Sequence, residues 1–251
     1  MKLLDRIYLV GSGGFGFGMT DPFDCHVYLI DGGDELAIID VGAGMGAEAI
    51  IENVRAEGFD PARIEHVILT HAHGDHAGGV ARMQGLIGSP TVYLSGVTAD
   101  YIRTGDEKGV SIDVAKAVGI YPADYRLEPC QIDVELAEGD TIAVGDLRLQ
   151  VFDTPGHCDG HVSLLLERGE ERILFAGDAV FFGGKILLQN IHDCRLDAMI
   201  GSLRKLRGLE VTALLSGHVT PALSGGQSHI EKANQVLDKL LIPEQLVSGV
   251  W

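Results

Sequence analysis

The segment from residue 70 to residue 76 carries the densest set of chemically active side chains in this sequence. It reads Thr-His-Ala-His-Gly-Asp-His, so three imidazoles and one carboxylate fall within a single short turn. Burying an imidazole or a carboxylate without a partner is costly, whereas a divalent ion such as zinc or iron makes such a cluster favourable by coordination. A metal site is therefore the leading interpretation of this segment.

The spacing of these side chains favours two metal positions. Residues 65–69 predict a short buried strand, and the glycines that follow predict a tight loop leading into a helix. His71 and His73 alternate at the end of this strand and can point the same way. Asp75 and His76 come after a glycine and turn toward a second position. The segment lacks the glutamate between two histidines that marks the helical zinc proteases.

Further ligand-type residues follow three later apolar runs. These runs cover residues 146–153, 172–176 and 212–215, and the residues that follow them are His157, Asp178 and His218. Glycine stands beside each of these residues, as expected where a scaffold directs side chains from strand ends into one cleft. The sequence thus predicts a site assembled from separate segments.

Taken together, these motifs resemble the metal-binding motifs of the metallo-β-lactamase superfamily over nearly the whole chain. They are His71-Ala-His-Gly-Asp-His76, Thr154-Pro-Gly-His157, Gly177-Asp178 and Ser216-Gly-His218. The resemblance implies two divalent metal ions, with zinc expected and iron or manganese as alternatives. It assigns the first metal to His71, His73 and His157, the second to Asp75, His76 and His218, and a bridging role to Asp178. For His161 it suggests a supporting role beside the ligands.

The predicted elements indicate an α/β (α+β) fold in two halves of similar content. Strands are expected near residues 6–10, 26–31, 36–40, 65–69, 91–94 and between 131 and 176, and helices near 47–57, 76–86, 196–207 and 227–240, with a strand at 212–215. The resemblance implies a four-layer αββα sandwich of two mixed sheets with helices on the outer faces. Residues 1–251 are predicted to form one domain, with an insertion at about 97–128 over the active site or at a subunit contact.

Composition and charge exclude several classes of function. The formal net charge of −17 argues against nucleic acid as a partner, because a polyanionic backbone needs clustered lysines and arginines. Asp5 and Arg6 interrupt any signal peptide, and no apolar run is long enough to span a membrane, so a cytoplasmic location is expected. The four cysteines form no Cys-x-x-Cys pair and are expected to be free thiols.

The predicted chemistry is hydrolysis of a small carbonyl substrate. Two divalent metals that share a water molecule lower its pKa to about 7, which makes hydroxide available at neutral pH. In the family pattern Asp75 orients this water and passes a proton to the leaving group, so Asp75 is the expected catalytic residue. We therefore expect a dinuclear zinc-dependent hydrolase of a lactone, an ester or a thioester.

Differences between this sequence and the patterns of known subfamilies indicate which substrates are expected. A bridging aspartate at 178 is unusual in true dizinc β-lactamases, which makes β-lactam hydrolysis a minor alternative. Glyoxalase II is similar around Thr154–His157 but carries a C-terminal helical domain for glutathione. Acyl-homoserine lactone hydrolases place a tyrosine where this chain has Phe181. Candidate replacements for that helper group are Tyr28, Tyr93, Tyr101, Tyr121 and Tyr125.

Several alternatives stay open from the sequence. Phe181 and Lys185 lie just after the bridging aspartate and are predicted to contact the apolar and anionic parts of a small-molecule substrate. The glycine-rich segment 11–18 is expected to be a loop bordering the cleft rather than a nucleotide site.

A mononuclear iron persulfide dioxygenase and a metal-dependent phosphodiesterase are the other enzyme classes that the sequence leaves open. A homodimer is expected to use residues 97–128 or 181–191.

Overall fold

The computed structural model describes residues 1–247, and the chain divides into two compact units. The first unit contains Met1–Leu136 with Val144–Asp146, and the second contains Ala137–Ala143 with the chain from Leu147 onward. The first unit therefore includes the strand expected near residues 131–136, and the two units do not divide the sequence at a single point. One domain over the whole chain stays a prediction.

The first unit is built on a mixed sheet. Within residues 1–247 its strands are, in spatial order, β1 (Lys2–Leu4), β2 (Ile7–Gly11), β3 (Val27–Asp31), β4 (Leu36–Ile39), β5 (Ile64–Ile68), β6 (Thr91–Ser95) and β7 (Val134–Leu136). Strands β1 to β4 pair antiparallel, whereas β4 to β7 pair parallel. The strand β4 is buried at every position, as expected of a strand covered on both faces. The carboxyl ends of β4 and β5 consequently lie at the same edge of the sheet.

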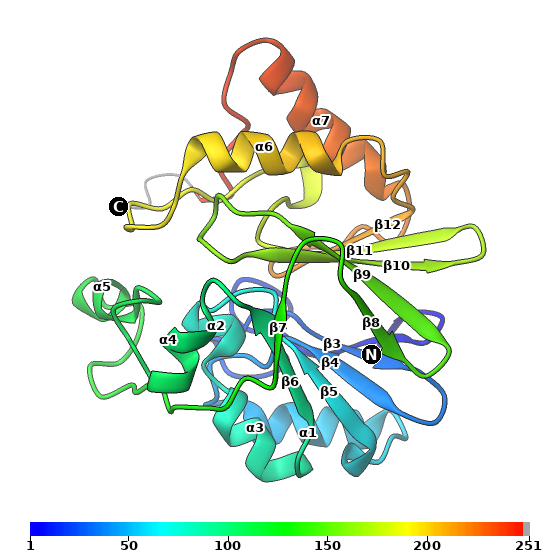
Figure 1. Cartoon of the computed structure of the whole chain (residues 1–251), viewed down its shortest axis with the longest axis vertical. Helices are drawn as coiled ribbons and strands as arrows, with labels where there is room; N and C mark the ends of the chain where they lie inside the picture. The colour runs from blue at the N-terminus through cyan, green and yellow to red at the C-terminus, as the bar shows by residue number, and fades with distance from the viewer. Residues whose placement is uncertain (248–251) are drawn as a thin grey trace. The chain divides into compact units, whose positions relative to one another are not determined.

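Short helices and turns connect the strands of the first unit. They are α1 (Ala47–Ala56), the turn η1 (Pro61–Arg63), α2 (Gly74–Ala77), α3 (Val80–Ile87), α4 (Ala99–Thr104) and α5 (Ile112–Ala117). In Figure 1, α1 and α3 lie on one side of the sheet strands of this unit. The helix α1 buries Ile50, Ile51 and Val54 in the core of the unit, which is the apolar stripe of an amphipathic helix.

The second unit is built on a second mixed sheet. Among the described residues its strand order is β12 (Ala213–Ser216), β11 (Glu171–Gly177), β10 (Val162–Arg168), β9 (Leu147–Asp153) and β8 (Thr141–Val144). The strand β10 is antiparallel to both β9 and β11, and β11 is parallel to β12. Strands β9, β11 and β12 therefore run in the same direction and end at one edge of this sheet.

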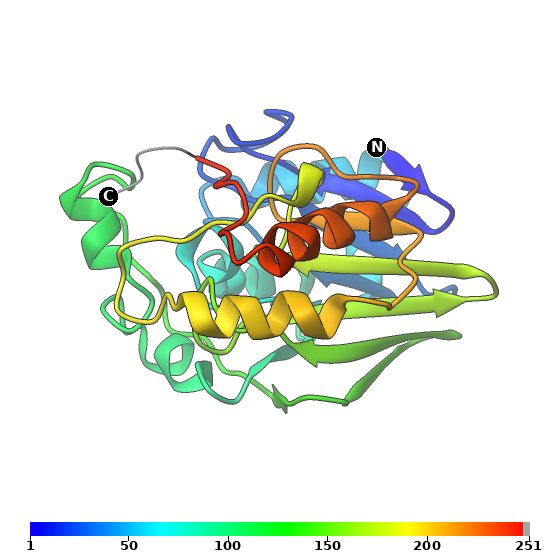
Figure 2. The same cartoon turned by 90° about the horizontal axis from the view of Figure 1, so that it is seen from above.

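Two long helices, α6 (Leu196–Leu206) and α7 (Gly226–Asp238), accompany the second sheet, together with the turn η2 (Phe182–Gly184). Figures 1 and 2 show α6 and α7 side by side on one face of the strands of this unit. The helix α6 buries Met199, Leu203 and Leu206, and α7 buries Ile230 and Leu237 in the same apolar cluster. Their burial stabilises this face of the sheet by the hydrophobic effect.

The structure corrects one predicted helix. The sequence predicts a single helix over residues 76–86, but α2 ends at Ala77 and α3 begins at Val80. Gly79 lies so close to neighbouring backbone that an added Cβ would stand 2.7 Å from the Val41 carbonyl oxygen and 2.9 Å from Gly44 Cα. The helix is therefore interrupted at Gly78 and Gly79, where the chain packs closely against the backbone of Val41 and Gly44. Across residues 1–247, none of the helices has the length and apolar character needed to cross a membrane.

Candidate metal centre

The first unit brings four of the predicted ligands together in the loop after β5. We call His71, His73, Asp75 and His76 the first set. The rings of His71 and His76 have centroids 4.0 Å apart, and those of His71 and His73 are 4.7 Å apart at 77°. The helix α2 starts within this loop, where the carbonyl of His73 accepts the backbone N–H groups of His76 and Ala77. The turn thus gathers these side chains into one cluster.

Asp40 orients two imidazoles of the first set. Its carboxylate accepts the backbone N–H and the hydroxyl of Thr70, each at 2.8 Å, and it lies 2.8 Å from His76 Nδ1. The Thr70 hydroxyl lies 3.0 Å from His71 Nδ1. A hydrogen bond at Nδ1 selects the tautomer whose Nε2 can bind a metal. Asp40 therefore acts on His76 directly and on His71 through Thr70.

The sequence reasoning missed Asp40, although a signal was present. The apolar strand β4 ends directly before Asp40, with Gly42 close behind, as the later strands end at their predicted ligands. Asp40 also has a φ of 58°, in the left-handed region that few residues other than glycine, asparagine and aspartate adopt. Its three acceptor contacts explain how the fold holds it there.

The second unit brings together the other predicted ligands. We call His157, Asp178 and His218 the second set, and they follow β9, β11 and β12 at one sheet edge. One oxygen of Asp178, Oδ2, lies 3.6 Å from His157 Nε2 and 3.5 Å from His218 Nε2. All three residues are buried. His157 Nδ1 lies 3.0 Å from the Leu187 carbonyl oxygen, which again directs Nε2 toward the carboxylate.

His161 supports the second set from behind. Its Nε2 accepts the backbone N–H of Asp178 at 2.9 Å, and its Nδ1 lies 2.9 Å from the Thr154 hydroxyl. Thr154 in turn lies 2.9 Å from the Ser163 hydroxyl. Since Nε2 accepts a hydrogen bond, it carries a lone pair rather than a proton. His161 therefore holds the backbone at Asp178, in the supporting place that the resemblance suggested.

The buried thiols near these sets are neutral. Within the described chain all four cysteines are free thiols, as expected. Burial raises the pKa of Cys25 to about 12, although nearby His76 acts in the opposite direction. Burial likewise raises the pKa of Cys158 well above its usual value. A thiol needs a lowered pKa to act as a nucleophile, so neither residue is activated for that role.

Phe181 and Lys185 lie in the second unit with contacts of their own. Phe181 is fully buried, and its backbone N–H donates to the Lys185 carbonyl at 2.9 Å. The Lys185 ammonium lies 2.9 Å from a carboxylate oxygen of Glu244. The negative charge of Glu244 thus already balances the positive charge of Lys185. The assignment of both residues to substrate binding stays a prediction.

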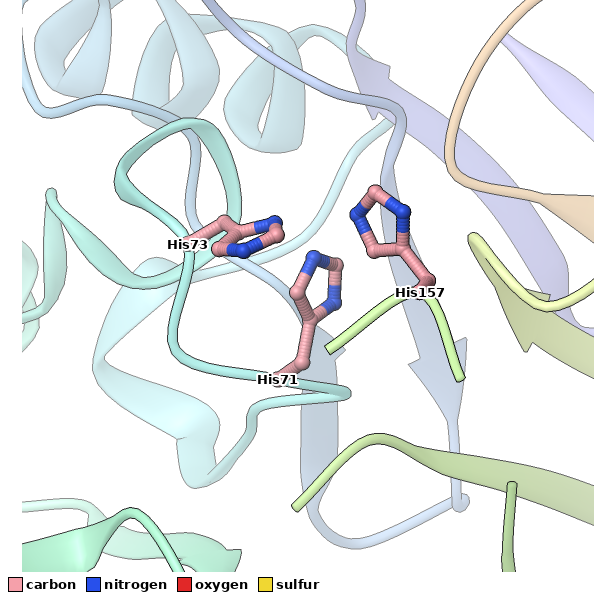
Figure 3. Close-up of side chains that lie close together, drawn as sticks. All are labelled: His71, His73 and His157. Atoms are coloured by element: carbon pink, nitrogen blue, oxygen red, sulfur yellow. The ribbon is translucent and has the colours of Figure 1, made fainter. Parts of the chain in front are cut away.

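The two sets fit divalent metals by the chemistry of their donors. Figure 3 shows the imidazoles of His71 and His73 on the loop after β5, and it also draws His157 from the second set. Imidazole nitrogens and carboxylate oxygens are ligands of zinc, iron and manganese. Buried imidazoles with hydrogen-bonded Nδ1 atoms are the arrangement that metal-binding histidines adopt in proteins.

Comparisons with known proteins agree with this chemistry. A family model described as "Metallo-beta-lactamase superfamily" matches residues 20–218. An uncharacterised protein of Aquifex aeolicus is 35% identical over 160 residues, which are 64% of this chain and 66% of that protein. A hydroxyacylglutathione hydrolase of Rhodopseudomonas palustris is 30% identical over 65% of this chain and 50% of its own length. An acyl-coenzyme A thioesterase of Homo sapiens is 26% identical over 77% and 72%.

These three alignments span between 50% and 72% of the length of the relatives. Solved structures show the fold. A metallo-β-lactamase family protein of Thermus thermophilus has a TM-score of 0.73 at 24% identity and covers 95% of this chain and 81% of its own. A mutant metallo-β-lactamase of Cronobacter sakazakii has a TM-score of 0.70 at 20% identity, with coverages of 96% and 95%.

The two mixed sheets with their helices match the α/β sandwich fold of these structures, as the sequence predicted. The matched family segment includes both sets of candidate ligands. The chain belongs to the metallo-β-lactamase superfamily.

Proposed function

We propose that this protein is a metal-dependent hydrolase with two divalent ions, zinc being the expected metal, and that it cleaves a thioester. The observation that carries the proposal is the pair of histidine and carboxylate sets, in which His71, His76 and His157 are buried and oriented through Nδ1, in a chain of this superfamily. Lactones and oxygen esters remain within the same chemical class. Relatives named as a thioesterase, an acyl-coenzyme A thioesterase and a hydroxyacylglutathione hydrolase favour the thioester.

The proposed ligands are those of the sequence prediction. His71, His73 and His157 would hold one ion, Asp75, His76 and His218 the other, and Asp178 would bridge them. When bound, the ions would activate a water molecule at neutral pH and polarise the carbonyl group of the substrate. Asp40, Thr70 and His161 would hold the imidazoles and the bridging aspartate in place through the hydrogen bonds described above.

Asp75 would transfer a proton from the attacking water to the leaving group. Its carboxylate is partly exposed, with 28% of the side chain accessible, and its Oδ2 lies 3.7 Å from His76 Nε2. In this position the carboxylate can accept a proton from the attacking water and deliver it to the leaving group. A thiolate leaves more readily than an alkoxide, because its conjugate acid has a pKa near 8.5. This makes a thioester the least demanding substrate of the three.

The substrate is proposed to be a small molecule, in keeping with the net charge of −17. A cytoplasmic location and a homodimer remain predictions from the sequence. Neither one bears on the reaction proposed for the two sets.

The test combines metal analysis with a substrate panel. We expect about two zinc ions per chain and release of thiol from an S-acyl substrate by the purified protein. His71→Ala, Asp75→Asn and Asp178→Ala are expected to reduce turnover to background. His192→Ala is the matched control, because this histidine is 54% exposed and belongs to neither set.

Other results would replace the proposal. One iron per chain with a persulfide-dependent uptake of oxygen would identify a dioxygenase. Hydrolysis confined to a phosphodiester or to a β-lactam would identify one of the other two alternatives. Full activity in a protein that holds no metal would reject the metal-dependent mechanism altogether.

A further inference from the structure

The segment 97–128, expected as an insertion, packs against the loop that carries the first set. After α4 and α5 it presents two buried tyrosines, Tyr121 and Tyr125, to the core of the first unit. Their rings are stacked, with centroids 4.7 Å apart and an interplanar angle of 16°. Phe23 lies on Tyr121 at 5.6 Å. Ring contacts with Tyr125 and Phe23 therefore restrain Tyr121.

The two hydroxyl groups have different partners. Tyr125 donates to the backbone carbonyl of Ala43 at 2.9 Å. Burial raises the pKa of the Tyr121 hydroxyl well above its usual value, and the nearby Asp75 carboxylate acts in the same direction through its charge and a hydrogen bond. The closeness of Tyr121 to this loop is also visible at Gly74, where an added Cβ would stand 3.1 Å from Tyr121 Oη and 3.2 Å from its Cζ. The hydroxyl thus lies at the start of α2, directly beside Asp75.

We propose that Tyr121 is a positioning residue for Asp75, whose carboxylate it holds in one orientation by a hydrogen bond. This inference rests on the function proposed above, in which Asp75 binds a metal and carries the proton. Asp75 belongs to a helix of only four residues and is partly exposed, so its rotamer depends on side-chain contacts. A stacked, buried ring carries its hydroxyl at a fixed place, which suits a supporting group. The segment 97–128 thereby becomes part of the site.

The test compares Tyr121→Phe with Tyr125→Phe. Each variant loses one buried hydroxyl and keeps its ring in the stack, but the Tyr125 hydroxyl donates to the Ala43 carbonyl, whereas the Tyr121 hydroxyl lies against the loop at Gly74, next to Asp75. We measure zinc affinity by competition with a chromophoric chelator, steady-state kinetics on an S-acyl thioester, and thermal stability. Tyr121→Phe is expected to lower zinc affinity at one position or kcat by about 10- to 100-fold. KM should change little, because Tyr121 holds the carboxylate rather than the substrate.

A double-mutant cycle with Asp75→Asn separates positioning from packing. If Tyr121 acts through Asp75, Tyr121→Phe should have little further effect on zinc affinity in the Asp75→Asn protein. Equal effects in both backgrounds would reject the proposal and leave Tyr121 with a purely structural role. Equal behaviour of Tyr121→Phe and Tyr125→Phe in zinc affinity and kcat would reject it as well.

The wild-type protein in the same experiment tests the proposed function on its own. If wild type binds no zinc and cleaves no thioester, the proposed function fails and the role of Tyr121 fails with it. If wild type behaves as proposed while Tyr121→Phe matches Tyr125→Phe, only the role of Tyr121 is rejected.

Discussion

At the scale of single residues, the site depends on hydrogen bonds behind the proposed ligands. Asp40 accepts two bonds from Thr70 and faces His76 Nδ1, all within the buried core of the first unit. His161 performs the matching task behind Asp178 in the second unit. Each partner fixes which ring nitrogen or which backbone position faces the ligand cluster. Removing a buried acceptor leaves its donors without compensation.

Asp40→Asn is expected to weaken both the fold and the metal site. The amide keeps the shape but replaces one acceptor oxygen with a donor, which opposes the donors of Thr70 and His76. We expect the free energy of unfolding to fall by about 1–3 kcal/mol and zinc affinity to fall by about 10- to 100-fold. Denaturant unfolding of metal-free protein and chelator competition measure the two effects.

Asp100→Asn is the control for this change, because Asp100 is 88% exposed and pairs with Arg103 at the surface. Surface ion pairs contribute at most about 1 kcal/mol, so this variant should stay close to wild type. Finding Asp40→Asn no different from Asp100→Asn would contradict the role given to Asp40.

Asp24 gives a prediction about pH. Burial raises the pKa of this carboxyl group, even though it accepts the backbone N–H of Ala43 at 2.8 Å. The folded state therefore binds the proton more tightly than the unfolded state. The stability contribution of Asp24 is lost as pH rises through the unfolded and then the folded pKa. The charged form is thus a cost to the fold at neutral pH.

Asp24→Asn removes this charge and should make the metal-free protein more stable at pH 7. The advantage should shrink as pH falls through the raised folded-state pKa, and it should vanish below the unfolded value of about 3.9. Denaturant unfolding of both proteins at several pH values tests this. An advantage that persists or grows at the lowest pH would show that burial of the charge is not its source.

At the scale of elements, the break between α2 and α3 follows from what packs on it. An added Cβ on Gly78 would stand 2.1 Å from Tyr125 Oη, and one on Gly79 would meet the backbone at Val41 and Gly44. Neither Gly78 nor Gly79 has a positive φ. Close packing, rather than an unusual backbone conformation, therefore requires glycine there.

Gly78→Ala should destabilise the protein by overpacking against Tyr125. Forcing an extra carbon into a packed core costs about 1–3 kcal/mol. Gly85→Ala in α3 is the control, because an added Cβ at Gly85 meets nothing within 4 Å. Alanine in place of an exposed helical glycine should raise the free energy of unfolding by up to about 1 kcal/mol. Thermal and denaturant unfolding measure both; equal effects of the two substitutions would refute the packing explanation.

At the scale of the whole molecule, each unit carries one set of potential ligands, which follow the ends of strands of its own sheet. The proposed metal pair draws on both sets. A ligand that binds the folded protein and not the unfolded chain stabilises the fold by mass action. We therefore expect bound metal to raise the free energy of unfolding in addition to its role in catalysis.

Removal of metal by a chelator is expected to lower the Tm of wild type, and added zinc should restore it. At a zinc concentration of about 100 times Kd the gain is about 2.7 kcal/mol. Differential scanning calorimetry with and without zinc measures the shift. His71→Ala should lose most of the response, whereas His192→Ala should keep it. A wild-type Tm that ignores both chelator and zinc would speak against metal binding.

The sequence by itself determined the residue types and their spacing at the strand ends, and from these the family and the mixed α/β fold. This was possible because ligand motifs are local, so alternation along a strand and a glycine turn fix which side chains emerge together. Four candidate ligands gather after β5, and the others follow β9, β11 and β12, as the apolar runs predicted.

Only the tertiary structure decided which distant residues support those ligands. Asp40 reaches His76 from 36 positions away, Lys185 pairs with Glu244, and Tyr121 packs on the loop that carries Asp75. The break at Gly78 and Gly79 also follows from such contacts. Hydrogen bonds and close packing between segments far apart in sequence depend on how the sheet and its loops fold together, so a local pattern can mark a residue such as Asp40 without naming its partners.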